Sequence, residues 1–372
     1  MTSSYGLTLE FPEPDIAVLT FDDPQRRVNV LSRETLQRLD ELLDELAARP
    51  DLAGVVIRSA KPGEFLAGAD VHQLAERVAK ARGEEVEAAS RRGQTIFRRL
   101  EKLPAVTVAA IEGRCFGGGT ELASWCDRRL VADSAATEVS CPEVHLGIFP
   151  GWGGTVRLPR LVGVAPAVEL ITSGEAQSAV ALRRIGWAED VVSGEKLLEA
   201  AVRLVREEQS TGSYRADRIR RAAPLTMAPP EREFLVSTAL SQIRQVTRGR
   251  QPAPEIALRL IVEGAGLSVD DACARESQEL GRLWGGPAHR GLFNVFQLRE
   301  RAKKDIAVPQ GEVRREFSHV GVVGTGLMGA GIAGIALRRE LQVHVVDQHD
   351  EALQRGTKQI LDEAAYDRKL HG

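Results

Sequence analysis

The sequence GRCFGGGTELASWCD, Gly113–Asp127, carries the strongest indication of the fold. An apolar run, Thr107–Glu112, leads into the glycines 117–119, and a helix-forming segment containing Glu121 follows. At the start of a helix the backbone N–H groups lack partners and can hold negative charge, and glycine lets another molecule approach closely. The pattern predicts the amide of Gly118 as a donor to a developing negative charge. The alternative is a glycine turn for tight packing, with Glu121 complementing the helix dipole.

Two further segments have the same small-residue, rigid character. FLAGAD, Phe65–Asp70, ends a strand-like stretch in a turn that offers a second backbone donor. CPEVHLGIFPGWGGTVRLPRLVG, Cys141–Gly163, places Glu143 directly after a proline and ahead of a loop rich in glycine and proline. This is a rigid setting for an acid, although each segment taken alone is also compatible with an ordinary surface turn.

Length, charge and cysteine content limit the classes of protein to which this chain can belong. A chain of 372 residues fits two or three domains. The formal net charge is -3, and no dense basic run suggests a nucleic-acid partner. Four cysteines without C-x-x-C spacing predict buried thiols rather than a metal site. Because neither a basic leader nor a long apolar segment is present, we expect no transmembrane segment and a cytoplasmic protein.

The predicted secondary-structure pattern changes twice along the chain. Up to about Val192 short β-rich runs alternate with helices, which is typical of an α/β domain. From about Gly194 to Arg315 helical periodicity dominates. The predicted strands are Ile16–Phe21, Gly54–Ser59, Thr107–Glu112 and Arg129–Ala132. The predicted helices are one opened by Ser32 and closed by Pro50, one over Val71–Leu100 with possible breaks at Gly83 and Gly93, and five more over Leu197–Glu207, Arg232–Arg248, Ala253–Glu263, Asp270–Leu283 and Gly291–Lys304.

A second glycine motif follows a connection predicted at Ile306–Gln310. The apolar strand His319–Val323 runs into the sequence GTGLMG, which has the spacing G-x-G-x-x-G, and a helical segment follows. A second strand, Gln342–Val346, ends at Asp347, about 20 residues after Gly324, as expected for an acid that binds an adenosine ribose. This context predicts a dinucleotide site, with the pyrophosphate at the helix N-terminus, and a final helix begins near Glu351.

Taken together, the three N-terminal segments resemble the crotonase, or enoyl-CoA hydratase/isomerase, family. The resemblance covers roughly Ile16 to Val192, with weaker support from Val28–Ser32 and Thr172–Gly174. It implies a crotonase-type ββα spiral that binds an acyl-CoA thioester and adds water to a trans-2-enoyl-CoA in fatty-acid β-oxidation, without a cofactor. By position in the motifs, the oxyanion hole would consist of the Ala69 and Gly118 amides, Glu143 would protonate the α-carbon, Glu121 would orient and activate the water, and further substrate contacts would come from Ala67, Gly68, Asp70, Gly117, Pro150 and Gly151.

The C-terminal motif resembles the opening of a 3-hydroxyacyl-CoA dehydrogenase, the module that follows the hydratase in multifunctional β-oxidation α-subunits. The implied NAD contacts are Gly324, Gly326, Leu327, Met328, Gly329 and Asp347. We therefore expect an enoyl-CoA hydratase domain over 1–193, a helical extension over 194–316, and an incomplete Rossmann-type βαβα start over 317–372. Because the sequence stops at Gly372, we expect weak or absent NAD binding and no dehydrogenase activity from this chain by itself.

Alternatives stay open at this point. One is Δ3-Δ2-enoyl-CoA isomerisation at the same site, and another is an inactive fragment or a module that binds CoA or thiolase. Family resemblance implies a homo-oligomer or association with a thiolase β-subunit. Candidates for the CoA phosphates are Arg26, Arg27 and Lys61, each also compatible with a solvated surface charge. We read His72 and His145 as structural.

Overall fold

The computed structural model describes residues 6–70, 73–74, 80–304 and 317–365, in two compact units, Met1–Arg301 and Ala302–Gly372. The predicted boundary after residue 193 falls within the first unit, and both predicted boundaries remain predictions. The connection predicted at Ile306–Gln310, the start of the helix predicted at Val71, and His72 lie outside the described residues.

A six-stranded sheet forms the centre of the first unit, in the order β1-β2-β3-β5-β7-β10. Strand β1 pairs antiparallel with β2, and the other neighbours are parallel. Parallel strands buried on both faces read as continuous apolar runs, and β5, VTVAAI, is buried at every position. The strands are β1 Leu7–Glu13, β2 Ile16–Phe21, β3 Gly54–Ser59, β5 Val106–Ile111, β7 Arg128–Ala132 and β10 Asp190–Val192.

Four short strands form a second sheet in the order β4-β6-β8-β9, and three of them each follow a strand of the first sheet in the sequence. Its strands are β4 Glu64–Leu66, β6 Arg114–Phe116, β8 Glu138–Ser140 and β9 Gln177–Ser178. Strands β3, β5 and β7 of the first sheet are each followed by one strand of the second and then by a helix. The repeated strand–strand–helix unit is the predicted ββα spiral, and in it α4 and η2 start directly after β6 and β8 of the second sheet.

Helices cover both faces of the larger sheet. On one face Ile16, Val18 and Val108 pack against Leu197 and Val205 of α8, Leu197–Thr211. On the other face lies the main core, to which helices α1, Arg33–Ala47, α3, Gly83–Lys102, and α4, Gly118–Trp125, contribute. Burial on both faces fixes the sheet and therefore the strand ends that precede the candidate site.

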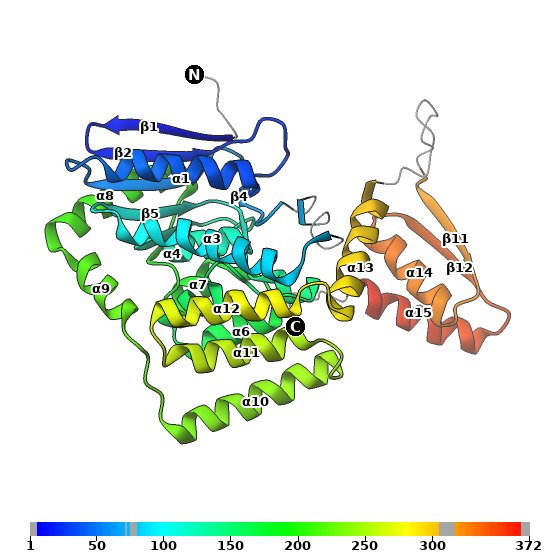
Figure 1. Ribbon diagram of the computed structural model, residues 1–372. Helices are drawn as coiled ribbons and strands as arrows, with labels where there is room; N and C mark the ends of the chain where they lie inside the picture. Colours follow the sequence, from blue (N-terminus) through cyan, green and yellow to red (C-terminus); the bar gives the residue numbers. More distant parts are fainter. Residues whose placement is uncertain (1–5, 71–72, 75–79, 305–316, 366–372) are drawn as a thin grey trace. The chain divides into compact units, whose positions relative to one another are not determined.

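Three further helices, α12 Val269–Leu283, α11 Pro252–Ala265 and α10 Pro229–Thr247, are stacked in layers that start at α3. Helix α12 packs on α3, α11 packs on α12, and α10 packs on α11 (Figure 1). Backbones of α3 and α12 approach closely, because a Cβ added to Gly281 would lie 2.6 Å from the carbonyl oxygen of Gly83. The other elements are the 3-10 helices η2 Pro142–Leu146 and η3 Gly194–Lys196, and α5 Gly154–Val162, α6 Val164–Ser173, α7 Ala179–Arg184, α9 Ser213–Ala222 and α13 Pro287–Lys304.

The second unit has a parallel pair of strands, β11 His319–Val323 and β12 Gln342–Val346, with α14 Leu327–Arg338 and α15 Asp350–Ala365. Val322, Ala330, Ala333 and Ile360 form its small core. Exposed apolar side chains remain, among them Val323 and Val346. The predicted Rossmann-like beginning is therefore confirmed, with a two-stranded sheet whose apolar surface is partly uncovered.

Strand predictions agree closely with the structure, whereas several helices differ. The strands at Ile16–Phe21 and Gly54–Ser59 are confirmed, and the one predicted at Thr107–Glu112 is shifted by one residue. Helix α3 begins at Gly83, one of the predicted breaks, rather than running continuously from Val71. Gly93 does not break the helix. The absence of a side chain at position 93 leaves space for the Trp152 indole. Strand β1 and helix α9 were not predicted.

Substituting Ser32 with Ala tests the start of α1. The Ser32 hydroxyl accepts a hydrogen bond from the Thr35 amide at 3.1 Å and caps the helix. Its loss should lower the free energy of unfolding by about 1 kcal/mol, measured by denaturant titration. Ser237→Ala, on the exposed surface of α10, is the control and should leave stability nearly unchanged. Equal stability of both variants would contradict the capping role.

Candidate active site

Glu121 lies on the first turn of α4, and its carboxylate is buried. Helix α4 begins after Gly117, whose φ of 55° favours glycine. Oε1 of Glu121 accepts hydrogen bonds from the backbone amides of Trp152 at 2.7 Å and Gly154 at 2.8 Å. The side chain therefore complements the N-terminus of α5, not only its own helix dipole, and Oε1 is fixed by two donors.

Glu143 enters the same region from η2, where Pro142 opens the 3-10 helix. Its Oε2 is buried and has no hydrogen-bond partner among the described residues. A Cβ added to Gly117 would lie 2.7 Å from Oε1 of Glu143. Glycine at position 117 is therefore required twice, by its backbone conformation and by the carboxyl group that lies against it. A buried oxygen without a partner costs free energy, which is a common feature of sites that bind a ligand or water.

Electrostatics couples these two carboxyl groups. Burial raises the pKa of Glu121 well above its ordinary value, and the charges of Glu143 and Glu276 raise it further. Burial also raises the pKa of Glu143 to about 7. Like charges in a buried site disfavour simultaneous ionisation, so the pair favours a state in which one carboxyl group keeps a proton near neutral pH. An acid and a base can thus coexist there.

The two predicted backbone donors lie on adjoining turns. Gly68 has φ of 90°, and a Cβ there would lie 3.0 Å from the Phe116 carbonyl and 3.4 Å from the Gly118 nitrogen. The turn is held by hydrogen bonds from the Leu31 amide to the Gly68 carbonyl and from the Ala67 amide to the Asn29 carbonyl. Because Gly118 is the first residue of α4, its amide has no partner within that helix. The structure thus brings the FLAGAD turn beside the glycine turn.

Among the other predicted contacts, Gly151 packs against the helical extension. Its carbonyl accepts a hydrogen bond from the Ser90 hydroxyl, and a Cβ there would lie 2.4 Å from the Leu280 side chain. Pro150 lies against Gly154, the residue whose amide binds Glu121. Their loop therefore borders the carboxyl groups, and its backbone path leaves no space for larger residues.

Asp70 is buried and pairs with Arg26 at 2.7 Å. Arg26 also pairs with Asp23, and the Lys61 ammonium donates to the carbonyls of Asp23 and Arg26. Two of the three candidates for CoA phosphates thus have protein partners that tie the loop to the FLAGAD turn.

Trp152 borders the glycine turn at residues 117–119 and was not predicted. A Cβ on Gly118 would lie 2.5 Å from its ring, and one on Gly93 would lie 2.3 Å from it. Its indole meets Phe97 edge-on, with ring centroids 5.6 Å apart. The indole also borders a small pocket of about 90 Å³ that reaches Ala69 and Asp70. A large aromatic residue between glycines in the GWGG stretch was the available signal. The pocket is otherwise lined by Leu31, Arg33, Leu36, Gln73, Leu74, Ala89, Arg92 and Gly93.

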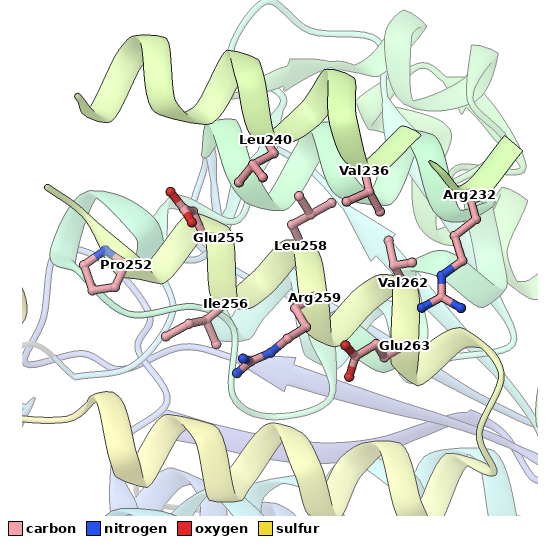
Figure 2. A pocket seen from close by; sticks show the side chains of 10 residues that line it. All are labelled: Arg232, Val236, Leu240, Pro252, Glu255, Ile256, Leu258, Arg259, Val262 and Glu263. Atoms are coloured by element: carbon pink, nitrogen blue, oxygen red, sulfur yellow. The ribbon is translucent and has the colours of Figure 1, made fainter. Parts of the chain in front are cut away.

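A larger cavity of about 410 Å³ lies elsewhere, between α10 and α11. Figure 2 shows Val236 and Leu240 of α10 facing Leu258 and Val262 of α11. None of the predicted site residues lines it. The remaining lining residues are Arg232, Pro252, Glu255, Ile256, Arg259 and Glu263.

The second unit contains the residues predicted to contact a nucleotide, at the end of β11, the start of α14 and the end of β12. Gly324 has φ of 90°, and a Cβ on Gly329 would lie 1.8 Å from the Gly324 carbonyl oxygen. Asp347, at the end of β12, accepts hydrogen bonds from the amide and hydroxyl of Thr325, which lower its pKa to about 2. Glycine turn, helix start and ionised acid fit the adenosine diphosphate part of NAD.

Metal and membrane signals are absent from the described part of the chain. No cluster of three potential metal ligands occurs within it. The four cysteines are free and buried, as predicted. No helix there has the length and apolar character required to cross a bilayer.

Comparison with known families agrees with this geometry. The family described as Enoyl-CoA hydratase/isomerase matches residues 13–228, and the 3-hydroxyacyl-CoA dehydrogenase NAD binding domain matches residues 319–371. The fold and site define a crotonase-type protein, and the chain belongs to the enoyl-CoA hydratase/isomerase family. Its two matched domains, in this order, are consistent with a multifunctional β-oxidation subunit.

Solved structures add similar proteins. An enoyl-CoA hydratase from Bacillus anthracis is 27% identical, with a TM-score of 0.50, covering 82% of this chain and 100% of its own. DspI of Pseudomonas aeruginosa is 28% identical, with a TM-score of 0.51, covering 70% of this chain and 96% of its own. An enoyl-CoA hydratase from Bacillus halodurans shares the fold at 18% identity and a TM-score of 0.56, covering 78% and 99%.

The raised pKa of Glu143 predicts how stability depends on pH. Its value rises from the ordinary 4.5 to about 7 in the folded state, so the folded protein binds the proton more tightly than the unfolded chain. This contribution to stability is complete below about pH 4.5 and is lost as pH rises through about 7. The unfolding temperature should therefore decrease as the pH rises from about 4.5 to about 7, and it should decrease less in Glu143→Gln. Glu233→Gln, at an exposed position of α10, should follow the unchanged protein, and identical pH dependence in all three proteins would refute the assignment.

Proposed function

We propose that the first unit hydrates trans-2-enoyl-CoA to 3-hydroxyacyl-CoA, in fatty-acid β-oxidation. The main support for this proposal is the pair of buried carboxyl groups. Glu121 accepts hydrogen bonds from two amides, and one oxygen of Glu143 has no partner among the described residues. A single water between two such groups has an acceptor for its proton and a neighbour that supplies one. Membership of the hydratase/isomerase family makes an acyl-CoA thioester the substrate class that suits this site.

Backbone amides supply the electrostatic part of the mechanism. The amides of Ala69 and Gly118 would donate to the thioester oxygen, on which negative charge grows as the β-carbon is attacked. Donors fixed before the reaction need no reorganisation when charge develops, and each contributes several kcal/mol in a buried site. The contact between the turn at Gly68 and the Gly118 nitrogen supports convergence of the two donors.

The carboxyl groups would divide the proton transfers. Glu121, oriented through Oε1, would accept a proton from water as the hydroxyl adds to the β-carbon. Glu143 would give its proton to the α-carbon, and the enolate oxygen returns to a carbonyl as the electron pair moves into the new C–H bond. One proton arrives from water and one leaves to carbon, so the pair ends with the same number of protons. Burial raises the pKa of both groups, so the pair can retain one proton near neutral pH.

For the second unit, we propose that Gly324, Gly326, Leu327, Met328, Gly329 and Asp347 contact NAD. When bound, NAD would supply hydride-transfer chemistry. The glycine turn would admit the pyrophosphate, the amides at the start of α14 would face its charge, and the Asp347 carboxylate would accept from a ribose hydroxyl. Association with a thiolase subunit or with further copies of the chain stays a prediction.

Replacing each glutamate separates hydration from isomerisation. Glu143→Gln should lower the rate of both reactions by about 100-fold or more, because the acid is lost. Glu121→Gln should abolish most hydration but preserve part of any Δ3-Δ2 isomerisation, since a proton shuttle needs only Glu143. Loss of enoyl-thioester absorbance with crotonyl-CoA measures hydration, and its gain with a 3-enoyl-CoA measures isomerisation. Glu112→Gln, at an exposed position, is the control. Full hydration by Glu121→Gln would overturn the assignment.

A proline tests the amide at position 118 separately from packing. Position 118 is the first residue of α4, where proline is compatible with a helix but lacks the N–H group. Gly118→Ala introduces the same Cβ against Trp152 and keeps the amide, so it is the matched control. We expect kcat for crotonyl-CoA to fall about 100-fold further in Gly118→Pro than in Gly118→Ala. Equal rates in the two variants would eliminate this amide as an oxyanion donor.

A further inference from the structure

A third carboxylate, Glu276 of α12, is built into the loop that holds Glu121. Its side chain is completely buried. Oε1 accepts from the Gly153 amide at 2.7 Å and from the Gln94 side-chain amide at 2.9 Å. Oε2 accepts from the Thr155 amide at 2.9 Å and from its hydroxyl at 2.6 Å. Four donors therefore meet one carboxylate, far more than a surface glutamate would attract.

The backbone donors alternate between two glutamates. Amides of Trp152 and Gly154 donate to Glu121, whereas the amides of Gly153 and Thr155 donate to Glu276. These four consecutive residues lead into α5, whose N-terminus attracts negative charge. The two carboxylates consequently hold opposite sides of one short segment. Any shift that frees the Glu276 side also displaces the donors that orient Glu121.

Helix α12 is itself firmly placed. Gln94 of α3 donates both to Glu276 and to the Cys273 carbonyl, and Arg98 of α3 pairs with Asp270. Close contact of the backbones at Gly83 and Gly281 completes the packing. The position of Glu276 is thus fixed by the helix pair as well as by its contacts with the loop.

We infer that Glu276 is a positioning residue for the reaction: by holding the amides of Gly153 and Thr155, it sets the place and orientation of the Glu121 carboxylate, so that α12 is part of the active site. The inference rests on the proposed hydration. The family match ends at residue 228, and α12 follows it in the sequence. Glu276 and Glu121 bind alternate amides of the same loop, so a shift of the loop also shifts the Glu121 carboxylate. Misplacement of a reacting group by about 1 Å lowers the rate by about 100-fold.

The charge of Glu276 acts on the same pair. It raises the pKa of Glu121 and of Glu143, and burial raises its own pKa to about 7. Nearby cations are engaged elsewhere. The titratable groups that interact with these carboxyl groups include Glu121 on α4, Glu143 on η2, Cys141 before η2 and Cys273 on α12. The neighbouring arginines have other partners: Arg98 on α3 pairs with Asp270, Arg157 on α5 pairs with Glu101, and Arg160 on α5 donates to backbone carbonyls.

Glu276→Gln in the full chain tests the inference, with Glu279→Gln as its matched control. Glu279 lies on the same helix, and its carboxylate pairs with Arg259 and Arg282. Hydration of crotonyl-CoA by Glu276→Gln should show kcat about 100-fold lower with KM little changed. Because a negative charge is removed beside two carboxyl groups, the pH profile of kcat should also shift toward lower pH. A residue that only supports the fold would lower the amount of active enzyme and leave the profile in place.

Two further variants keep the test decisive if Glu276→Gln folds poorly. Thr155→Val removes only the hydroxyl contact to Oε2 and should lower kcat less than Glu276→Gln. Glu276→Asp keeps the charge and should retain the wild-type pH profile despite a lower kcat. If the unchanged chain hydrates crotonyl-CoA and Glu276→Gln matches Glu279→Gln in kcat and pH profile, the positioning role is refuted while the proposed function stands. No hydration by the unchanged, folded chain overturns both.

Discussion

Four consecutive backbone amides at the start of α5 are the constraint on which the site depends. They bind two buried carboxylates, Glu121 and Glu276, which approach from different helices. Burying a carboxylate is costly unless it is hydrogen-bonded, and a helix start is costly unless its amides find acceptors. Each requirement satisfies the other here, so the loop between η2 and α5 gains one defined conformation from groups that would be unfavourable separately.

The fold delivers these groups through its repeated strand–strand–helix unit. Strands β3, β5 and β7 of the six-stranded sheet are each followed by a short strand of the second sheet, and the turns after β6 and β8 open α4 and η2. Gly68, Gly117 and Gly153 adopt positive φ in these turns. Glycine at these positions lets the backbones approach one another, and the close contacts place amides and carboxyl groups in one small volume. Packing of apolar residues on both faces of the sheet makes that arrangement rigid.

The predicted helical extension packs within the first unit as far as Arg301. The secondary-structure pattern of the sequence predicts a hydratase domain before residue 194 and a helical connecting region after it. In the structure, α8 covers one face of the central sheet, and α12 packs on α3 and supplies Glu276. A compact unit reaching Arg301 follows from those contacts. The similarity to a hydratase from Bacillus anthracis over 82% of this chain likewise extends beyond the segment that the family match covers.

The ββα class, the central strands, the family and the glycine motif of the second unit could be predicted from the residues alone, because these features arise from local patterns: apolar runs, caps and turns that only glycine adopts readily. The same motifs contain Glu121 and Glu143. The packing of distant segments, in contrast, establishes which amides hold Glu121, that Trp152 covers Gly118, and that Glu276 lies beside the pair. Hydrogen bonds between residues more than one hundred positions apart depend on how α12 packs against α3, and no local periodicity encodes that contact.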